Sequence, residues 1–199
     1  LRHVKKYEKM GWLRVPDETQ LSGWSTRTHV VPKKDDPEGR FICDYRLLNR
    51  STSKTPIVMS EAFDLVQTLS AKRYKSCFDA VSGFNQLKCS ESTSRLLTIM
   101  TSIGLRQWTV LPFGVTNGPS AFQQCMQFSF EDMLGAQMSS EELGEVFLAY
   151  FIDDGDLGTG NAYEENEGDF DVHLKALEKV FERASRVGLR FKLSKCSFA

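Results

Sequence analysis

Hydrophobic and polar positions along the chain predict two hairpins within its first 114 residues. Residues 25–34 (STRTHVVPKK) and 40–46 (RFICDYR) are rich in β-branched and aromatic side chains, and the polar stretch DDPEG joins them. Such runs, separated by turn residues, are typical of a hairpin, here with a loose polar turn. Residues 96–114 (LLTIMTSIGLRQWTVLPFG) repeat the pattern and predict a second hairpin, with SIG at its turn.

Further strands are predicted in the rest of the chain. Residues 74–84 (YKSCFDAVSGF) indicate a strand that runs into a turn containing glycine, and residues 189–195 (LRFKLSK) alternate as a last strand. The apolar run VFLAYFI at 146–152 predicts a buried strand that leads into a hairpin, FIDDGDL. Because glycine is a poor strand former and Asp156 adds charge, we expect the return arm of this hairpin to be less regular.

Three segments have the apolar spacing of helices. Residues 60–69 (SEAFDLVQTL) begin with Ser60 as the N-cap, and residues 117–134 (NGPSAFQQCMQFSFEDML) have Pro119 in the first turn. From Asp171 a third stripe runs to Gly188, which ends the helix. Residues 135–145 and 158–170 read as loops, the second exposed and acidic. Because strands and helices alternate without the regularity of a doubly wound sheet, the predicted fold class is α+β.

The apolar faces of two of these helices can be listed from the same spacing. The helix at 117–134 places Phe122, Met126, Ser129, Phe130 and Met133 on one face, and the helix after Asp171 has the stripe Leu174, Leu177, Val180, Phe181, Ala184 and Val187.

Composition bounds the class of protein. The 199 residues are 41% hydrophobic and 11% aromatic, enough for a sizeable core, and no apolar run approaches the ~20 residues of a membrane helix. The basic start LRHVKKYEKM has no apolar segment behind it, so we expect no secretion signal. Five scattered cysteines without a CxxC pair argue against a zinc site or a disulfide framework, and we expect them to be small core residues in a reducing compartment.

Charge is distributed unevenly along the chain. The net charge is −1, but residues 1–60 carry a balance of +5 and residues 131–199 a balance of −8. A basic first part fits a polyanionic partner, and an acidic last part fits a solvated loop together with a metal-binding cluster.

Two adjacent aspartates, Asp153 and Asp154, follow the most apolar strand of the chain. Buried carboxylates are costly unless something pairs with them. Asp79 follows another apolar strand 74 residues earlier. Acids on neighbouring strand ends can hold two Mg²⁺ ions about 3.5–4 Å apart, the arrangement used for displacement at phosphorus. The alternative is that Asp153 and Asp154 belong to an ordinary polar hairpin turn.

At these positions the sequence resembles a known family. FIDD is similar to the YxDD signature of reverse transcriptases, with Phe151 in the place of the usual tyrosine. WSTRTHVVPKKDDPEGRFICDYRLLN resembles the fingers segment of gypsy-type LTR-retrotransposon polymerases, FDAVSGFNQL resembles LDLRSGYHQI, and VLPFGVTNGPSAFQ resembles MPFGLTNAPATFQ. HLKALEKVFERASRVGLRFKLSKCSF resembles the helix and strand that follow the catalytic hairpin. The motifs occur in the family's order over nearly the whole chain.

The resemblance implies a fold and a set of subdomains. The expected fold is a right-hand polymerase fingers and palm, with a ferredoxin-like antiparallel palm sheet packed on helices. Residues 1–54 and 87–117 would form the fingers, and residues 55–86 and 118–199 the palm. A thumb, a connection and an RNase H domain would lie outside this chain, in the remaining polyprotein.

The resemblance also implies catalytic and metal-binding roles. Asp79 and Asp153 match the metal ligands, Asp154 is the second acid of the pair, and Val81 belongs to the same metal set. The cofactor would be two Mg²⁺ ions, with Mn²⁺ as an alternative. Lys195 matches the basic residue of the final strand that is proposed to donate a proton to the leaving pyrophosphate.

The residues matched to dNTP binding come from several motifs. Lys33 and Arg40 match fingers residues that hold the triphosphate, although exposed hairpin charges would look the same. Phe84 matches the aromatic residue beneath the sugar, and its alternative is a core ring. The other matched positions are Ala80, Val81, Ser82 and Gly83, whose backbone would meet phosphate oxygens, and Phe113 and Gly114, which would touch nucleotide and template.

The predicted function is therefore an RNA-directed and DNA-directed DNA polymerase, a nucleotidyltransferase of a retroelement that uses dNTPs, primer and an RNA or DNA template. The alternative is a domesticated or decayed copy that binds nucleic acid or a protein partner without polymerising. An RNA polymerase with the same palm is disfavoured by Phe84, whose ring would crowd a ribose 2′-hydroxyl. The expected location is intracellular, in a cytoplasmic virus-like particle or in the nucleus, with no membrane partner.

Overall fold

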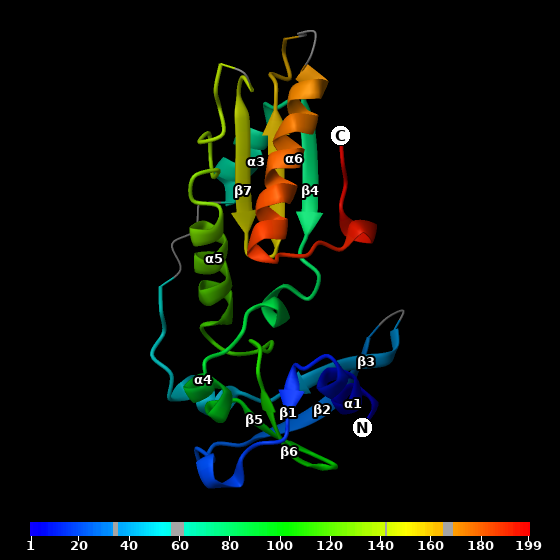
Figure 1. Cartoon of the computed structure of the whole chain (residues 1–199), viewed down its shortest axis with the longest axis vertical. Coiled ribbons are helices and arrows are strands. Elements are labelled where there is room, and N and C mark those ends of the chain that lie inside the picture. Colours follow the sequence, from blue (N-terminus) through cyan, green and yellow to red (C-terminus); the bar gives the residue numbers. More distant parts are fainter. Residues whose placement is uncertain (34–35, 57–61, 142, 165–168) are drawn as a thin grey trace. The chain divides into compact units, whose positions relative to one another are not determined.

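The chain divides into two compact units in the computed structural model, which describes all residues except 34–35, 57–61, 142 and 165–168. The first unit consists of Leu1–Thr55 and Phe84–Gly118, and the second of Pro56–Gly83 and Pro119–Ala199 (Figure 1). At Lys33, Asp36, Ala62 and Asp169 only the backbone is described. The assignment of fingers and palm to residue ranges stays a prediction.

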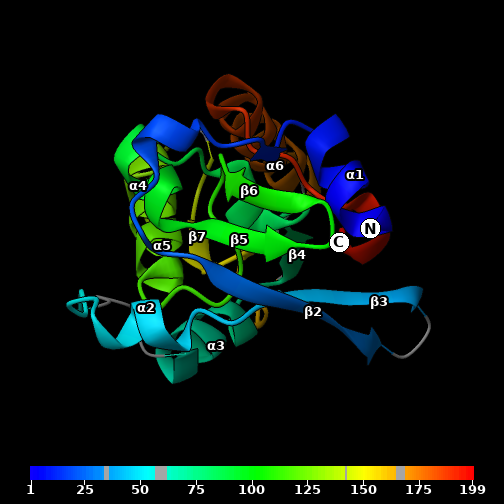
Figure 2. The ribbon, with the colours of Figure 1, turned by 90° about the horizontal axis from the view of Figure 1, so that it is seen from below.

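A five-stranded sheet forms the centre of the first unit, in the order β1-β6-β5-β2-β3. Both predicted hairpins are confirmed, because β2 pairs with β3 and β5 with β6 in antiparallel register, while β2 and β5 run parallel. Figure 2 shows β2 and β3 as a long ribbon beside the shorter β5–β6 pair. The strands are β1 (Leu13–Arg14), β2 (Thr26–Lys33), β3 (Asp36–Cys43), β5 (Thr98–Thr101) and β6 (Gly104–Trp108).

The second strand of the first hairpin begins earlier than predicted. We expected DDPEG to be a loose connection, but β3 already begins at Asp36. Gly39 lies inside this strand with φ of +69°, and a Cβ atom there would sit 2.6 Å from the carbonyl oxygen of Val31. Glycine permits the strand to approach its partner closely at this irregular point of the register.

Short helices and a compact aromatic core complete the first unit. Val4 of α1 is buried, and the ring of Tyr7 stacks on Trp12 with ring centroids 5.6 Å apart. This helix was not predicted, because its short basic sequence has few apolar residues to mark a buried face. The helices are α1 (Arg2–Lys9), η1 (Glu18–Gln20), α2 (Arg46–Arg50), α4 (Glu91–Leu96) and η2 (Gly83–Gln86), whose first residue belongs to the second unit.

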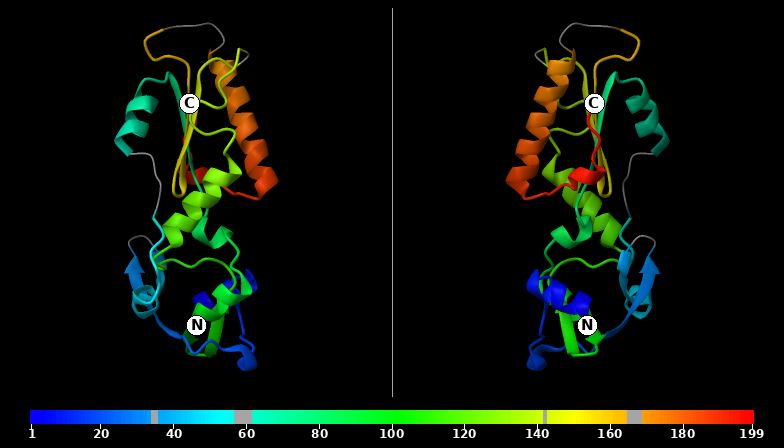
Figure 3. Two further views of the ribbon diagram at one scale, coloured as in Figure 1. Left: turned by 90° about the vertical axis from the view of Figure 1, so that its left-hand side faces the viewer. Right: turned by 90° about the vertical axis from the view of Figure 1, so that its right-hand side faces the viewer.

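The second unit is built on a three-stranded antiparallel sheet in the order β4-β8-β7, formed by β4 (Tyr74–Asp79), β7 (Val146–Phe151) and β8 (Asp154–Thr159). Figure 3 shows α3 (Ala62–Ser70) and α6 (Asp169–Val187) on opposite faces of this sheet. The predicted N-cap Ser60 lies outside the described residues. The predicted buried strand VFLAYFI is confirmed as β7, which ends one residue earlier than expected.

The return arm of the hairpin formed by β7 and β8 is regular, contrary to our expectation. All six residues of β8 pair with both β4 and β7. The prediction was wrong because Gly155 is covered by aromatic rings: a Cβ atom there would lie 2.5 Å from Cε1 of Tyr150 and 2.8 Å from Cδ2 of Phe78. The missing side chain makes room for these two rings and does not weaken the strand.

The apolar faces predicted for two helices can be compared with the burial of their side chains. The helix predicted at 117–134 is α5 (Gly118–Ser129), which ends five residues earlier than expected. Of its predicted face and the turn after it, Phe122, Met126, Phe130 and Met133 are buried as expected, whereas Ser129 is half-buried. In α6 the buried members of the stripe are Leu177, Val180 and Ala184, whereas Leu174, Phe181 and Val187 are partly exposed. Gly188, with φ of +75°, follows the last residue of α6.

The prediction of a regular last strand at residues 189–195 is wrong. Residues Leu193–Lys195 make a 3₁₀ turn, η3, and in the described part of the chain the strand pairing of this segment is limited to two isolated bridges, Phe191 with Ala80, just after β4, and Ser197 with Cys77 of β4. The segment still lies beside β4, so the spatial order of C-terminal segment, β4, β8 and β7 is that of a ferredoxin-like sheet. The turn interrupts the ladder that a regular strand would make.

Five free cysteines are present, and only part of the prediction for them holds. Cys43 is buried in the first unit, whereas Cys77 is exposed on the face of β4 that carries Asp79. The exposure of Cys77 follows from the alternation of side chains along β4, because the neighbouring residues Ser76 and Phe78 lie on the buried face of the strand. None of the helices in the described part of the chain combines the length and apolar character needed to cross a bilayer.

Candidate active site

Three aspartates come together at one end of the sheet in the second unit. Asp79 ends β4 and Asp154 begins β8, and the antiparallel register places these two residues opposite one another. The backbone amide of Ala80 donates to the carbonyl oxygen of Asp153 at 2.9 Å, which ties the hairpin turn to the end of β4. In Figure 1 this is the end to which the arrow of β4 points.

The turn that carries Asp153 has an unusual backbone. Phe151 pairs with Asp154, so Ile152 and Asp153 alone close the hairpin. Ile152 has φ of +58°, a left-handed value that β-branched residues rarely adopt. Such a conformation costs of the order of 1–3 kcal/mol and persists only where the surrounding structure holds it.

Gly83 provides the space on one side of Asp153. A Cβ atom at Gly83 would lie 3.1 Å from Cβ of Asp153 and 3.2 Å from Cζ of the buried Phe122. The backbone of Gly83 is therefore packed between the aspartate and a core ring. Any side chain at this position would press on the carboxylate-bearing residue.

The cluster carries an excess of negative charge. Burial and the neighbouring charges of Asp153, Asp79 and Asp156 raise the pKa of the Asp154 carboxyl. Lys195 donates to Oδ2 of Asp79 at 2.6 Å, and this bond, with further attraction from Asp153 and Asp154, raises the pKa of the lysine. One lysine therefore faces three carboxylates.

The donor set suits a hard divalent cation. Within the described residues, no group of three His, Cys, Asp or Glu side chains is already spaced to enclose a metal ion. Mg²⁺ does not require such a cage, because it is commonly held by one or two carboxylates together with water and substrate phosphates. The ammonium group of Lys195 on Asp79 occupies the kind of position that a cation favours.

Other residues matched from the sequence are near these aspartates in the second unit. Ser82 is exposed and has φ of +50°. The amide of Val81 donates to the carbonyl oxygen of Arg190 at 2.9 Å, and that of Ala80 to Asp153, so these two amides already have protein acceptors.

The remaining matched residues belong to the first unit. The rings of Phe84 and Phe113 lie with centroids 5.0 Å apart, Phe84 half-buried and Phe113 exposed. Gly114 has φ of +94° beside Tyr45. Arg40 is exposed on β3, and Lys33 ends β2 with its side chain outside the described part.

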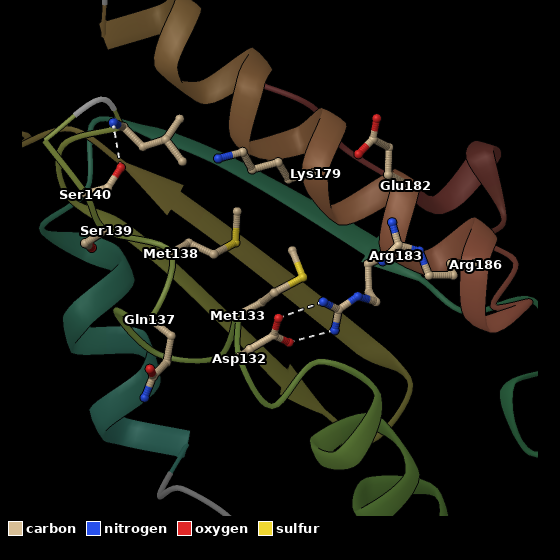
Figure 4. A pocket seen from close by; sticks show the side chains of 11 residues that line it. Asp132, Met133, Gln137, Met138, Ser139, Ser140, Lys179, Glu182, Arg183 and Arg186 are labelled. Carbon is tan, nitrogen blue, oxygen red and sulfur yellow. Dashed lines mark hydrogen bonds and ion pairs between the residues drawn. The ribbon is translucent and has the colours of Figure 1, made fainter.

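A separate cleft of about 330 Å³ lies between α6 and the loop after α5. Figure 4 shows Arg183 directed at Asp132, to which it donates two hydrogen bonds of 2.7 Å. Lys179 and Arg186 line the same cleft. None of the residues matched from the sequence lines it, so it is distinct from the aspartate cluster.

Comparison with known proteins relates the chain to one family. The family model described as reverse transcriptase (RNA-dependent DNA polymerase) matches residues 31–199. The chain is 29% identical over 186 residues to the retrovirus-related Pol polyprotein from transposon 412 of Drosophila melanogaster, covering 91% of this chain and 14% of that protein. It is 27% identical over 197 residues to the polyprotein from transposon gypsy of the same organism, covering 94% and 17%.

A plant-virus protein shows a similar relation. The chain is 28% identical over 182 residues to the enzymatic polyprotein of figwort mosaic virus (strain DxS), covering 92% of this chain and 25% of that protein. The chain thus spans a quarter or less of the length of these three relatives.

Solved structures share the fold. The foamy viral protease-reverse transcriptase dRH in complex with double-stranded DNA gives a TM-score of 0.76 at 22% identity, covering 98% of this chain and 30% of that chain. The foamy viral protease-reverse transcriptase in complex with an RNA/DNA hybrid also gives 0.76, at 23% identity, covering 98% and 23%. At this identity the likeness establishes the fold, which is the predicted α+β fold of a right-hand polymerase.

Proposed function

The chain belongs to the reverse transcriptase family, and on that premise we propose that it is the fingers and palm of a retroelement DNA polymerase. Its reaction would be nucleotidyl transfer from a dNTP to a primer 3′-hydroxyl on an RNA or DNA template. The observation that carries the proposal is the register of Asp79 against Asp154, with Asp153 tied to the end of β4.

Asp79 and Asp153 are the proposed metal ligands, with Asp154 as the second acid and the backbone of Val81 in the same set. Two Mg²⁺ ions, or Mn²⁺ in their place, would make the primer hydroxyl a better nucleophile and neutralise the leaving pyrophosphate. Positioning and charge neutralisation supply most of the barrier lowering in phosphoryl transfer. The chain's own contribution is to hold its carboxylates at fixed points on adjacent strands.

Other residues would bind the nucleotide. Lys33 and Arg40 are proposed to contact the triphosphate, and Phe84 to lie beneath the sugar. Lys195 is proposed to give its proton to the pyrophosphate oxygen as the bond to the α-phosphorus breaks. Its exposed ammonium group is compatible with this role, because it can exchange Asp79 for a substrate oxygen without a change of fold.

The type of retroelement from which the chain comes is also a proposal. We propose a gypsy-type LTR retroelement, because the ordered motifs span most of the chain and the gypsy polyprotein matches 94% of it. The chain would then be part of a polyprotein whose thumb and RNase H segments lie elsewhere, and it would act in a cytoplasmic virus-like particle or in the nucleus.

Primer extension with a homopolymer template, Mg²⁺ and dNTPs tests the proposal. The wild-type chain should extend the primer, and Asp79→Asn should not. The matched control is Asp64→Asn, which makes the same change at an exposed position on α3. If the folded wild-type chain binds primer-template but adds no nucleotide, the alternative of a copy that binds without polymerising is favoured.

A further inference from the structure

The side-chain amide of Gln123 forms two hydrogen bonds with the catalytic hairpin. Gln123 lies on α5 and is 5% exposed. Its Nε2 atom donates to the carbonyl oxygen of Tyr150 at 3.0 Å, and the backbone amide of Ile152 donates to its Oε1 atom at 2.8 Å. Both polar ends of a buried side chain are thus satisfied by the backbone on either side of Phe151.

These bonds occupy the outer side of β7. In the described sheet β7 has β8 as its strand neighbour on one side only, and Phe151 pairs with Asp154 across that side. Because backbone groups alternate along a strand, Tyr150 and Ile152 direct theirs away from β8. The amide of Gln123 bonds them in the way that a residue of a neighbouring strand would.

The two hydrogen bonds of Gln123 lie next to the strained residue of the hairpin turn. Ile152 is the residue with φ of +58°, and Asp153 follows it directly. Without a partner for its amide, Ile152 would leave a half-buried backbone donor without its protein acceptor, and the turn could relax toward a more common conformation. A change in the Ile152 backbone would redirect the Asp153 side chain, since the two share a peptide bond.

We propose that Gln123 is a positioning residue that holds Asp153 in its metal-binding orientation by fixing the Ile152 backbone. The inference rests on the proposed function for the role of Asp153. Gln123 does not touch the reacting atoms; it acts through the hairpin. Groups that bind metal must be held within about 0.5 Å of their productive geometry, and this requires buried supporting contacts of this kind.

Gln123→Met tests the role, with Gln124→Met as the matched control. Methionine keeps the length of the side chain and removes both bonds, while Gln124 undergoes the same change on the exposed side of α5. We expect kcat in primer extension to fall about 10- to 100-fold with little change in KM for dNTP, as for small displacements of catalytic groups. Mn²⁺ binding should weaken as well, and it can be measured from the electron paramagnetic resonance signal of free Mn²⁺. The control should match wild type in all three measurements.

A structural role alone would give a different result. In that case Gln123→Met would lower the melting temperature but leave kcat per folded molecule and the Mn²⁺ affinity at wild-type values, and the proposal would be overturned. If wild type itself extends no primer, the proposed function fails. The Mn²⁺ titration of wild type, Gln123→Met and Gln124→Met then still decides whether Gln123 supports the metal-binding geometry.

Gln123→Glu keeps the inference testable if the methionine variant does not fold. A protonated glutamic acid has the shape of glutamine, and its O–H can donate to Tyr150 while its carbonyl oxygen accepts from Ile152. Mn²⁺ affinity relative to wild type at the same pH should therefore be near normal at low pH and fall as the glutamate ionises. A constant ratio across the pH range would contradict the role of the two hydrogen bonds.

Discussion

Lys195 and Asp79 form an ion pair in which Nζ lies 2.6 Å from Oδ2 of the carboxylate. The lysine is the last residue of the 3₁₀ turn η3, and the amide of Lys192, three residues earlier, donates to the carbonyl oxygen of Asp79 at 2.8 Å. The C-terminal segment thus contacts both the backbone and the side chain of a proposed metal ligand. A cation that binds Asp79 has to compete with an ammonium group.

Lys195→Met should strengthen metal binding. Removing the lysine leaves Asp79 without its competing cation, and exposed ion pairs contribute about 0.2–1 kcal/mol, so we expect Mn²⁺ affinity to rise up to about fivefold. Primer extension should nevertheless fall if Lys195 protonates pyrophosphate. The control is Lys192→Met, whose side chain is exposed and has no ion pair with Asp79 in the described structure. Weaker Mn²⁺ binding in Lys195→Met would show that the lysine supports the site and does not compete for it.

Asp153→Asn should abolish primer extension without loss of folding. The substitution keeps the shape of the side chain, removes a charge that Mg²⁺ requires, and lowers the repulsion that raises the pKa of Asp154. We therefore expect a melting temperature equal to or above that of wild type, together with loss of activity. Asp64→Asn on α3 is the control for the charge change. Extension at the wild-type rate would remove Asp153 from the mechanism.

Most of the strands and the positions of the aspartates could be predicted from the sequence, but the contacts that hold the aspartates in place could not. Local pattern identifies Asp153 and Asp154, since an apolar strand that ends in two acids is visible within ten residues. Gln123 is 29 residues away from Ile152, and nothing in its own helix distinguishes it from Gln124 beyond the side of the helix it occupies.

Packing across the sheet explains the errors. Glycine has a low strand propensity, so Gly155 led us to expect an irregular β8. The rings of Tyr150 and Phe78, however, require a residue without a side chain at this position. The segment LRFKLSK has strand alternation, but its backbone bonds to the end of β4 and the two residues after it are limited to residues 190–192, and a turn at Leu193–Lys195 follows them. In both cases a contact with a distant residue decided the local structure, and short-range pattern does not contain it.

Gly155→Ala should destabilise the second unit. The added methyl group would meet ring atoms of Tyr150 and Phe78 at 2.5 and 2.8 Å, and overpacking of this kind typically costs about 1–3 kcal/mol. Thermal or urea unfolding measures the loss. Replacing Tyr150 by leucine in the same chain removes one of the rings, so the additional cost of Gly155→Ala should be smaller in that background. A neutral Gly155→Ala would mean that the rings can move aside.

Stability should fall on acidification because of His173. This residue of α6 is fully buried, with Nε2 2.7 Å from Oγ of Ser76 and Nδ1 2.8 Å from Oγ1 of Thr159. Burial lowers the pKa of His173 below its ordinary value of 6.5. The unfolded chain therefore binds a proton that the folded chain does not, and the free energy of unfolding decreases as pH drops below about 6.5.

His173→Gln isolates this contribution. Asp154 has the opposite effect, since its raised pKa makes protonation favour the folded chain at lower pH. The difference in unfolding free energy between wild type and His173→Gln removes this shared term and should shrink or change sign between pH 7.5 and about 5.5. A difference that is independent of pH would mean that His173 does not stay neutral in the folded protein.

Phe84→Ala distinguishes two roles for Phe84, selection of the nucleotide sugar and packing in the hydrophobic core. The half-buried ring contacts Phe113, itself 57% exposed, so the pair presents aromatic surface to solvent in the first unit. If Phe84 lies beneath the sugar, its loss should leave dNTP use in place and raise ribonucleotide incorporation sharply, because the 2′-hydroxyl is the group that distinguishes the two sugars. If the ring is core, the same change should cost up to about 3–5 kcal/mol and leave sugar preference unchanged. Phe128→Ala is the control, since it removes a ring of α5 that is 83% exposed and lies outside the proposed site, and competition between dNTP and rNTP on one template measures the preference. Unchanged selectivity in a destabilised Phe84→Ala chain would assign the ring to the core.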